Sequence, residues 1–166
     1  MVGQGADTLV RPYNGNYGGD IIRHGGWQVV PRFEVIDHIA DVGIVAYGSD
    51  LREAFANAAY GMFSLIAELD GVGDAVRREV DVQAPDQEAL LVAWLNELIY
   101  LFDVEYIVFT RFDITSLTEN RLQARVYGEK VDASRHRLKT AVKGATYHLL
   151  KVGREDGYRI QVILDV

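Results

Sequence analysis

Cysteine is absent from the 166 residues of this sequence. The protein therefore forms no disulfide bonds, and it has neither thiolate metal ligands nor a cysteine nucleophile. The absence of disulfides fits a reducing compartment. Lysines and arginines form no block, and the net charge is −7 at pH 7. Because duplex nucleic acids are bound through clustered cations, we do not expect a broad duplex-binding surface.

Long hydrophobic runs are missing as well. No apolar stretch approaches the roughly 18 residues that a transmembrane helix needs, and the first residues lack the charged-then-apolar pattern of a secretory signal. We therefore expect a cytoplasmic protein that does not associate with a membrane. The hydrophobic fraction of 49% and the charged fraction of 25% are ordinary for a globular protein. A chain of this length is expected to form one domain with a full core.

The chain has two regions of different composition. Glycines and polar residues are interspersed in the first 26 residues, and no hydrophobic period of 2 or 3.6 persists there. We expect residues 1–30 to form a glycine-rich extension, with at most one short strand at 20–23. Residues 31–166 are expected to form the folded domain.

Hydrophobic periodicity predicts two helices set among strands. The first helix is predicted to begin after Asp50, a good N-cap with Glu53 three residues on, and the second to begin at Pro85. The strands that follow the second helix are too closely connected for parallel crossovers. The predicted fold class is therefore α+β, a single domain in which a mainly antiparallel or mixed sheet packs with two amphipathic helices. Strands are predicted at 27–30, 32–36, 42–47, 78–83, 109–117, 121–127, 142–152 and 158–166, with a polar loop at 128–137.

Acidic residues at two distant points of the chain are candidates for a shared cation site. Asp41 follows Asp37 and His38 at the mouth of a predicted strand, and Asp165 precedes Val166 at the end of the last strand. If the two meet about 4 Å apart at an effective dielectric near 20, each like-charge pair costs about 4 kcal/mol. Such a cluster needs a cation or raised pKa values. The alternatives are an Asx turn with a hydrogen-bonded histidine at the first point and an exposed tail at the second.

The chemistry of the candidate ligands narrows the choice of ion. Ligation by oxygen alone favours calcium or magnesium, whereas a contribution from His38 would favour zinc or manganese.

Other polar residues give weaker indications. Glu129, with His136 downstream, is either part of a turn or part of a site. In a regular strand at 142–152, Lys143 and His148 would point to opposite faces, and an exposed strand lysine is ordinarily solvated. The sequence has no Gly-x-x-x-x-Gly-Lys phosphate loop and no Gly-x-Ser-x-Gly elbow. The residues alone therefore predict an α+β domain with an acidic cation site, and they name no substrate.

Five segments of the chain together resemble the archease family. They occur in the family's order and at compatible spacing, from about Arg32 to Val166, and the stretch 94–97 and the final pair 165–166 are the most diagnostic. The segments are His-Ile-Ala-Asp-Val-Gly at 38–43, Ala-Phe-Ala-Asn-Ala-Ala at 54–59, Leu-Leu-Val-Ala-Trp-Leu-Asn-Glu-Leu-Ile-Tyr-Leu-Phe at 90–102, Val-Lys-Gly-Ala-Thr-Tyr-His at 142–148 and Leu-Asp-Val at 164–166.

The resemblance implies an accessory protein of the RtcB-type RNA ligase of tRNA splicing and RNA repair, and not an enzyme. Such a protein promotes the GTP-dependent guanylylation of the ligase and its multiple turnover, so GTP and RNA are met indirectly, through the ligase. The family's metal is typically calcium, with magnesium or manganese as alternatives. The resemblance assigns this metal to Asp41, Asp165 and the main-chain oxygens of Val166.

Further positions match the family's motifs without an assigned role. The sequence departs from many relatives at Asp37, where glutamate is usual, and at Gly144, where alanine is commoner, and neither residue is among the proposed ligands. The additional functional candidates are His38, Glu129, Lys143 and His148.

Two other functions stay open beside this one. A divalent metal next to His38 could activate water, which would make the protein a metal-dependent hydrolase of a phosphorylated substrate. Against it, the sequence shows no dedicated nucleophile or phosphate loop. Alternatively, the protein could be a chaperone-like binding module with no metal requirement.

Overall fold

The structure, a computed structural model, describes residues 21–23, 29–37, 41–154 and 156–166. These residues form nine strands and two helices. In chain order the elements are β1 (Ile21–Arg23), β2 (Val29–Pro31), β3 (Phe33–Asp37), β4 (Asp41–Gly48), α1 (Leu51–Ile66), β5 (Val76–Gln83), α2 (Gln87–Glu105), β6 (Ile107–Leu117), β7 (Arg121–Lys130), β8 (Gly144–Arg154) and β9 (Tyr158–Asp165).

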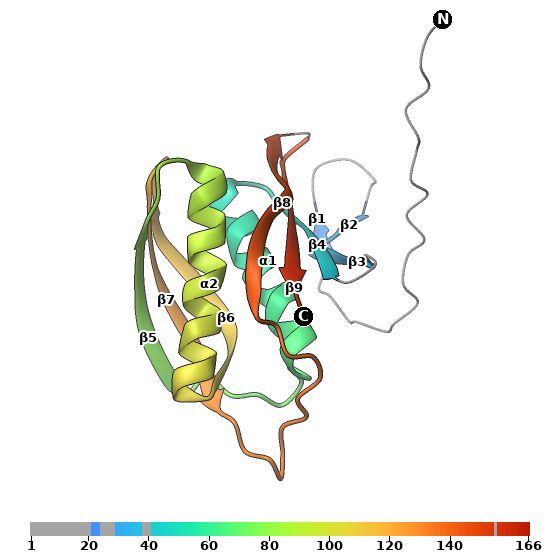
Figure 1. Cartoon of the computed structure of the whole chain (residues 1–166), viewed down its shortest axis with the longest axis vertical. Coiled ribbons are helices and arrows are strands. Elements are labelled where there is room, and N and C mark those ends of the chain that lie inside the picture. The colour runs from blue at the N-terminus through green and yellow to red at the C-terminus, as the bar shows by residue number, and fades with distance from the viewer. Residues whose placement is uncertain (1–20, 24–28, 38–40, 155) are drawn as a thin grey trace, which may run out of the picture.

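The two helices lie between two antiparallel sheets (Figure 1). One sheet has the strand order β3-β4-β9-β8, and the other has the order β5-β7-β6. Within the described part of the chain, the short strands β1 and β2 pair with each other and with no other strand. Helix α1 packs against β4 and β6, and α2 packs against β8 and β5. The predicted α+β class with two packed helices is therefore confirmed, and the strands are shared between two main sheets.

The first helix begins directly after Asp50, as predicted, whereas the second begins at Gln87, two residues after the predicted Pro85, because Asp86 is its N-cap. The carboxylate of Asp50 accepts a hydrogen bond from the backbone N–H of Glu53 at 2.8 Å, and Asp86 accepts one from Ala89 at 2.8 Å. The Glu53 carboxylate in turn accepts from the backbone N–H of Ser49, the residue before the N-cap, at 2.6 Å, which resembles a capping box shifted by one residue. The two N-cap contacts satisfy N–H groups that a helix leaves without partners in its first turn.

The core is formed by the apolar faces of both helices and the inner faces of both sheets. Trp94 of α2 is completely buried, and its indole N–H donates to the carbonyl oxygen of Phe55 in α1 at 3.1 Å. Phe63 of α1 meets Phe109 of β6 edge to face, with 5.6 Å between ring centroids. The aromatic side chains thus join the two helices to each other and to the β5-β7-β6 sheet.

The predicted polar loop at 128–137 is wrong at its start. Strand β7 continues to Lys130, because Gly128, Glu129 and Lys130 pair with β6. Glu129 is therefore a strand residue. Other strand boundaries shift by a few residues. β5 begins at Val76 and β6 at Ile107, directly after Tyr106, which ends α2 in a left-handed conformation with φ of 58°.

Strand β8 is irregular in its middle. Its pairing with β9 is regular from Gly144 to Thr146, then breaks, and resumes at Lys151. Leu149, within the break, has a positive φ of 53°. The simple alternation of faces expected for residues 142–152 therefore does not hold.

Within the described residues, neither helix combines the length and the apolarity required to cross a membrane.

Candidate functional site

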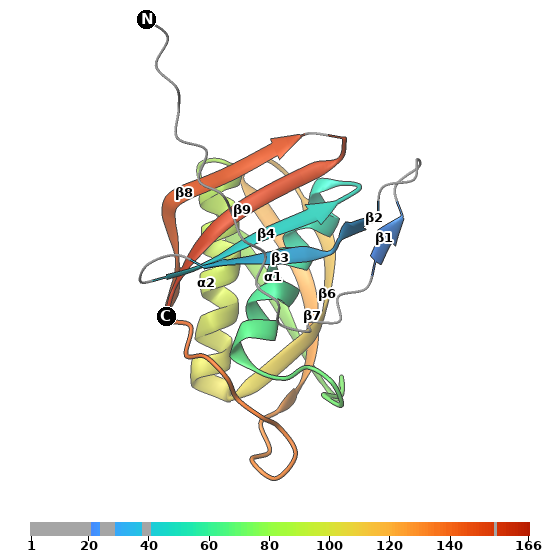
Figure 2. The same ribbon diagram turned by 90° about the vertical axis from the view of Figure 1, so that its right-hand side faces the viewer.

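Asp41 and Asp165 lie directly opposite each other on neighbouring strands. Asp41 is the first residue of β4, Asp165 is the last residue of β9, and the antiparallel register pairs them. Directly opposed residues have Cβ atoms about 4.5–5.5 Å apart and side chains on the same face of the sheet. The fold thus brings together the two carboxylates that the sequence singled out. Figure 2 shows the start of β4 and the C-terminal end of β9 at the same edge of the molecule.

The acidic pair lies on the sheet face turned away from the helices. The alternate residues Val162 and Leu164 belong to the core cluster that packs with the helices, whereas Ile163 is buried outside that cluster. Asp165 is exposed and Asp41 is half-buried. Neither carboxylate forms an ion pair or a side-chain hydrogen bond with any residue that the structure describes. Two adjacent negative charges are therefore left without a compensating partner from this part of the chain.

The packing around position 43 explains why a glycine follows Asp41 by two residues. It is paired with Ile36 on one side and with Ile163 on the other. A Cβ atom at Gly43 would lie 3.2 Å from Cδ1 of Ile163 and 3.3 Å from Cβ of Ile36. Glycine therefore lets these two isoleucines close together over the strand beside the acidic pair.

Lys143 lies at the same end of the sheet. Its backbone N–H donates to the carbonyl oxygen of Asp165 at 2.8 Å, and its ammonium group donates to the main-chain oxygen of Val166 at 3.2 Å. Lys143 was a weak candidate in the sequence, and the structure places it beside the acidic pair. The ammonium group contributes one positive charge to an end of the sheet that is otherwise acidic.

The available donors suit a hard cation. The carboxylates of Asp41 and Asp165 and the main-chain oxygen of Val166 are oxygen ligands of the type that calcium and magnesium prefer. No group of three or more His, Asp or Glu side chains with metal-binding geometry occurs among the residues described. Two carboxylates and a main-chain oxygen form a partial ligand set, which water or a partner would have to complete. His38 lies outside the described residues, and its contribution stays a prediction.

Glu129 is the centre of a separate network on the other sheet. Its carboxylate accepts from the backbone N–H of Gly73 at 2.8 Å and pairs with Arg135, and it lies 3.3 Å from Nε2 of His136. The Gly73 hydrogen bond, helped by Arg135 and His136, lowers the pKa of Glu129. The backbone N–H of Asp132 donates to Nδ1 of the buried His136 at 2.9 Å. Both ring nitrogens of His136 and the carboxylate of Glu129 therefore hold the segment that follows β7. The structure does not bring Glu129 to the acidic pair.

His148 lies apart from the acidic pair as well. It is exposed within the irregular part of β8, four residues after the Gly144 that pairs with Asp165. Its backbone N–H donates to Oγ1 of Thr146 at 3.3 Å. The structure thus gives His148 a place on the surface of the edge strand, beyond the three residues of β8 that pair with the end of β9.

Asn96 is a residue of this region to which the sequence gave no role. Its side-chain oxygen accepts a hydrogen bond from the backbone N–H of Ala145 at 2.8 Å, which ties α2 to the beginning of β8. The one indication of a role for Asn96 in the sequence was its place in the stretch 94–97, the most diagnostic part of the second helix. Helical periodicity could not identify the strand that Asn96 would meet.

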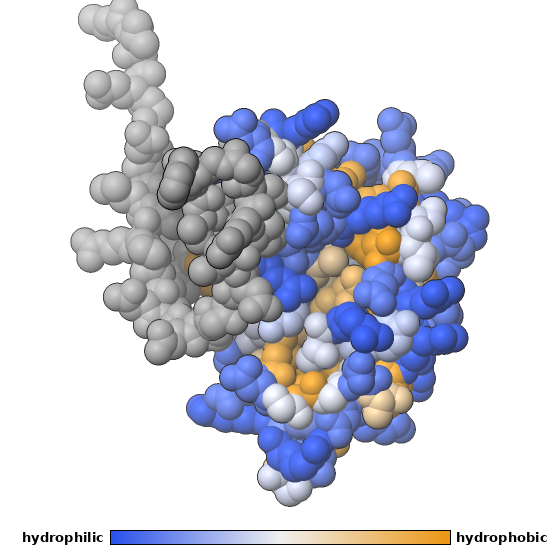
Figure 3. Space-filling model, turned by 180° about the vertical axis from the view of Figure 1, so that it is seen from behind, coloured by the Kyte–Doolittle hydropathy of each residue, from blue (hydrophilic) through white to orange (hydrophobic). Residues whose placement is uncertain are grey.

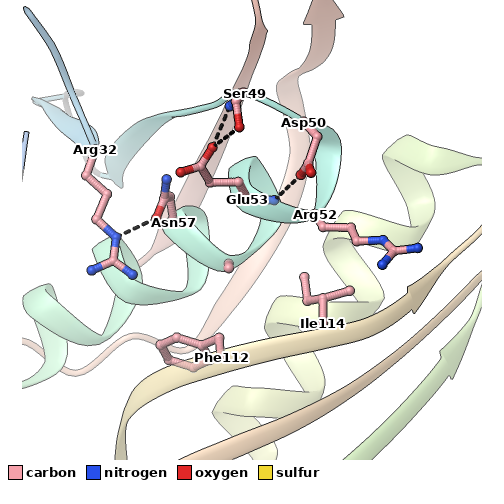
Figure 4. A pocket seen from close by; sticks show the side chains of 9 residues that line it. Arg32, Ser49, Asp50, Arg52, Glu53, Asn57, Phe112 and Ile114 are labelled. Carbon is pink, nitrogen blue, oxygen red and sulfur yellow. Dashed lines mark hydrogen bonds between the residues drawn. The ribbon is translucent and has the colours of Figure 1, made fainter. Parts of the chain in front are cut away.

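A cavity of about 530 Å³ lies elsewhere, between the start of α1 and β6 (Figure 4). Its polar groups already serve local structure. Asp50 caps α1 and Glu53 accepts from Ser49. The Arg32 guanidinium lies 3.9 Å from the ring centroid of Tyr60 and donates to the buried Asn57. None of the predicted metal ligands lines this cavity.

A family model matches most of the chain. The model described as "Archease protein family (MTH1598/TM1083)" covers residues 33–166. The protein archease of Methanosarcina acetivorans is 38% identical over 140 residues, which are 81% of this chain and 96% of that protein. The protein archease of Pyrococcus abyssi is 39% identical over 140 residues, with coverage of 81% and 99%.

Two solved structures share the fold. The solution structure of Methanobacterium thermoautotrophicum protein 1598 superimposes with a TM-score of 0.69 at 35% identity, over 81% of this chain and 99% of that one. The crystal structure of a Thermotoga maritima archease, described as a possible chaperone, gives a TM-score of 0.55 at 20% identity, over 79% and 94%. At that identity the second likeness supports the fold alone.

Proposed function

Because the chain belongs to the archease family, we propose that it is a metal-binding accessory protein of an RtcB-type RNA ligase. In this role it promotes the GTP-dependent guanylylation of the ligase and its repeated turnover in tRNA splicing or RNA repair. It acts on RNA and GTP through the ligase and not as an enzyme of its own. The observation that carries the proposal is the pairing of Asp41 with Asp165, without a compensating partner among the described residues.

The proposed cation is calcium, with magnesium or manganese as alternatives, held by Asp41, Asp165 and the main-chain oxygen of Val166. When bound, it supplies positive charge that offsets the repulsion between the carboxylates, about 4 kcal/mol for a pair 4 Å apart at an effective dielectric near 20. By ligating the same cation, the two carboxylates would hold the ends of β4 and β9 together. The same end of the sheet, with Lys143 beside it, is the surface that we expect to meet the ligase.

The test compares isosteric variants of these acids with a matched acid elsewhere. Asp41→Asn and Asp165→Asn each remove one charge and keep the side-chain volume. Asp81→Asn makes the same change on the other sheet, at a carboxylate that is already paired with Arg121. The readouts are calcium binding by calorimetry and the rate of joining by the ligase of 2′,3′-cyclic-phosphate and 5′-hydroxyl RNA ends. The two site variants are expected to lose both properties, and Asp81→Asn to retain both.

Normal activation of the ligase by both site variants would overturn the proposal. Release of phosphate by the purified protein, without ligase, from GTP or a cyclic phosphate would favour a metal-dependent hydrolase. Suppression of the aggregation of unrelated proteins, independent of calcium, would favour the chaperone-like role named for the Thermotoga relative. Seen from behind, the described surface is mainly hydrophilic, with its apolar residues in separate patches (Figure 3). A general chaperone is expected to offer a broader apolar surface.

A further inference from the structure

The side chain of Asn96 reaches from α2 to the beginning of β8, near the acidic pair. We propose that Asn96 is a positioning residue, which holds the start of β8 so that the Lys143 ammonium group stays on the main-chain oxygen of Val166. The inference rests on the proposed function only in that this end of the sheet is taken to be the functional end. The role of Asn96 itself is a property of the protein without metal and without ligase.

The first step of the argument is the hydrogen bond itself. Oδ1 of Asn96 accepts from the backbone N–H of Ala145 at 2.8 Å. Ala145 is buried and is paired with the buried Leu164 of β9. A Cβ atom at the neighbouring Gly144 would lie 3.6 Å from the same oxygen, so helix and strand are already in close contact there. The Asn96 side chain thus anchors the backbone of β8 to α2 at Ala145.

The second step is the short path from Ala145 to the acidic end. Lys143 precedes Ala145 by two residues, and its N–H and its ammonium group bond to Asp165 and Val166. A displacement of the backbone at Ala145 therefore moves the origin of the Lys143 side chain. Asn96 touches none of the candidate ligands in these contacts, so it acts through β8.

The third step is that pairing with β9 is by itself a weak constraint on the start of β8. β8 is at the edge of its sheet, so β9 is its sole strand partner in the described structure. Regular pairing there is limited to the three residues Gly144–Thr146, before the break that lasts to Lys151. A short paired segment at a sheet edge frays easily. A partly buried hydrogen bond from a packed helix supplies the constraint that the strand pairing lacks.

The experiment uses the full chain without metal and without ligase. Asn96→Ala removes the acceptor, and Asn96→Ser, which has a shorter side chain, provides a second variant if the alanine protein does not fold. The double change Asn96→Asp with Glu97→Gln restores an isosteric acceptor at an unchanged net charge. Asn57→Ala is the matched control, because Asn57 is a buried asparagine of α1 whose amide donates to the carbonyl oxygen of Tyr47 at 2.6 Å.

Two readouts report on Lys143 directly. Amide hydrogen exchange at Lys143 and Ala145 is expected to be at least about tenfold faster in Asn96→Ala, because the anchoring bond is lost. Acetylation of Lys143, measured by mass spectrometry relative to the exposed Lys151, is expected to rise about threefold or more, since the ammonium group is no longer held. The acceptor-restoring double variant should return both values to those of the wild type. Asn57→Ala should leave both unchanged, even if it lowers the melting temperature.

Wild-type exchange and acetylation at Lys143 in a folded Asn96→Ala or Asn96→Ser protein would overturn the inference. Equal changes in Asn57→Ala would also overturn it, since they would show a general loss of stability. A wild-type protein that binds none of calcium, magnesium and manganese would instead overturn the proposed function, and the result at Lys143 would still decide the role of Asn96.

Discussion

The two main sheets treat their exposed carboxylates in opposite ways. On the β5-β7-β6 sheet, acids have arginine partners. Asp81 pairs with Arg121 at 2.6 Å, and Glu79 pairs with Arg125 at 3.3 Å. Arg121 and Gln123 together lower the pKa of Asp81 to about 2. Every one of these charges is balanced within the sheet, so this surface is complete without another ion.

On the β3-β4-β9-β8 sheet, Asp41 and Asp165 oppose each other and have no ion-pair partner in the described part of the chain. Like charges directly opposite on neighbouring strands destabilise a sheet. The difference teaches that strand acids with arginine neighbours serve the scaffold, whereas the uncompensated pair is the place where we propose that a cation completes a site. The predictions below test this contrast.

The largest effect is expected from the scaffold sheet. A Cβ atom at Gly128 of β7 would overlap the carbonyl oxygen of Val108 and lie 2.8 Å from Cα of Phe109, both in β6. Because backbone atoms cannot move aside without separating the strands, Gly128→Ala should lower the free energy of unfolding by about 3 kcal/mol. Urea denaturation measures this change. A loss below about 0.5 kcal/mol would show that β6 and β7 lie further apart than described.

The next effect concerns the acidic pair. Calcium at about 100 times its dissociation constant should stabilise the wild-type protein by about 2.7 kcal/mol, as for any ligand that binds the folded state alone. Asp165→Asn should lose this gain, because it removes one of the two carboxylates. Thermal unfolding with calcium and with a chelator measures both proteins. Equal calcium-dependent shifts in the two proteins would contradict the assignment of Asp165 as a ligand.

A smaller effect is expected when a paired acid and an unpaired acid are each replaced in the metal-free protein. At pH 7, Asp81→Asn should lower stability because it breaks the pair with Arg121, whereas Asp165→Asn should not, since it relieves repulsion. The pKa of Asp81 falls from 3.8 to about 2 on folding. Its stabilisation is therefore fully present above about pH 5 and is lost as the pH falls through 4 toward 2.

Urea midpoints at pH 7 and pH 2 test this comparison. The difference between wild type and Asp81→Asn should shrink steadily with acidification. A difference that is independent of pH would mean that the Asp81 charge does not contribute. The metal-free Asp165→Asn protein should be at least as stable as the wild type at pH 7.

The smallest effect is expected at Gly144, which pairs with Asp165. A Cβ atom there would meet Oδ1 of Asn96 at 3.6 Å, an ordinary contact distance. Gly144→Ala should therefore change the free energy of unfolding by no more than about 0.5 kcal/mol, in contrast to Gly128→Ala. Calcium affinity, measured by calorimetry, should also stay within about twofold of the wild type. A large loss of stability or of calcium affinity in Gly144→Ala would indicate that Asn96 and β8 are packed more tightly than these distances imply.

Local features of the fold were predictable from the sequence, because their causes are local. Asp50 and the acids after Pro85 marked the helix starts, and alternation marked most strands. The division into two sheets was not predictable, since a periodic pattern defines faces and leaves the pairing partners open. Glu129 was misplaced for the same reason. Its glycine neighbour suggested a turn, whereas that glycine is required because β6 and β7 approach closely at this point.

The candidate site was predictable only in part. The register of β4 with β9 brings Asp41 beside Asp165, but no feature of either segment alone encodes this long-range pairing. Lys143 joined the pair through backbone contacts that depend on where β8 starts. Asn96 was hidden because its role depends on a strand almost fifty residues further along the chain. Calcium binding by the acidic pair stays a prediction, which the experiments above test.

The break in β8 has a consequence for behaviour at high concentration. An unbroken edge strand of this length would present a row of unpaired backbone groups to other copies of the protein, a common route to aggregation. The left-handed Leu149 and the interrupted register bend this row out of line. The irregular segment thus protects the open side of the sheet from edge-to-edge polymerisation.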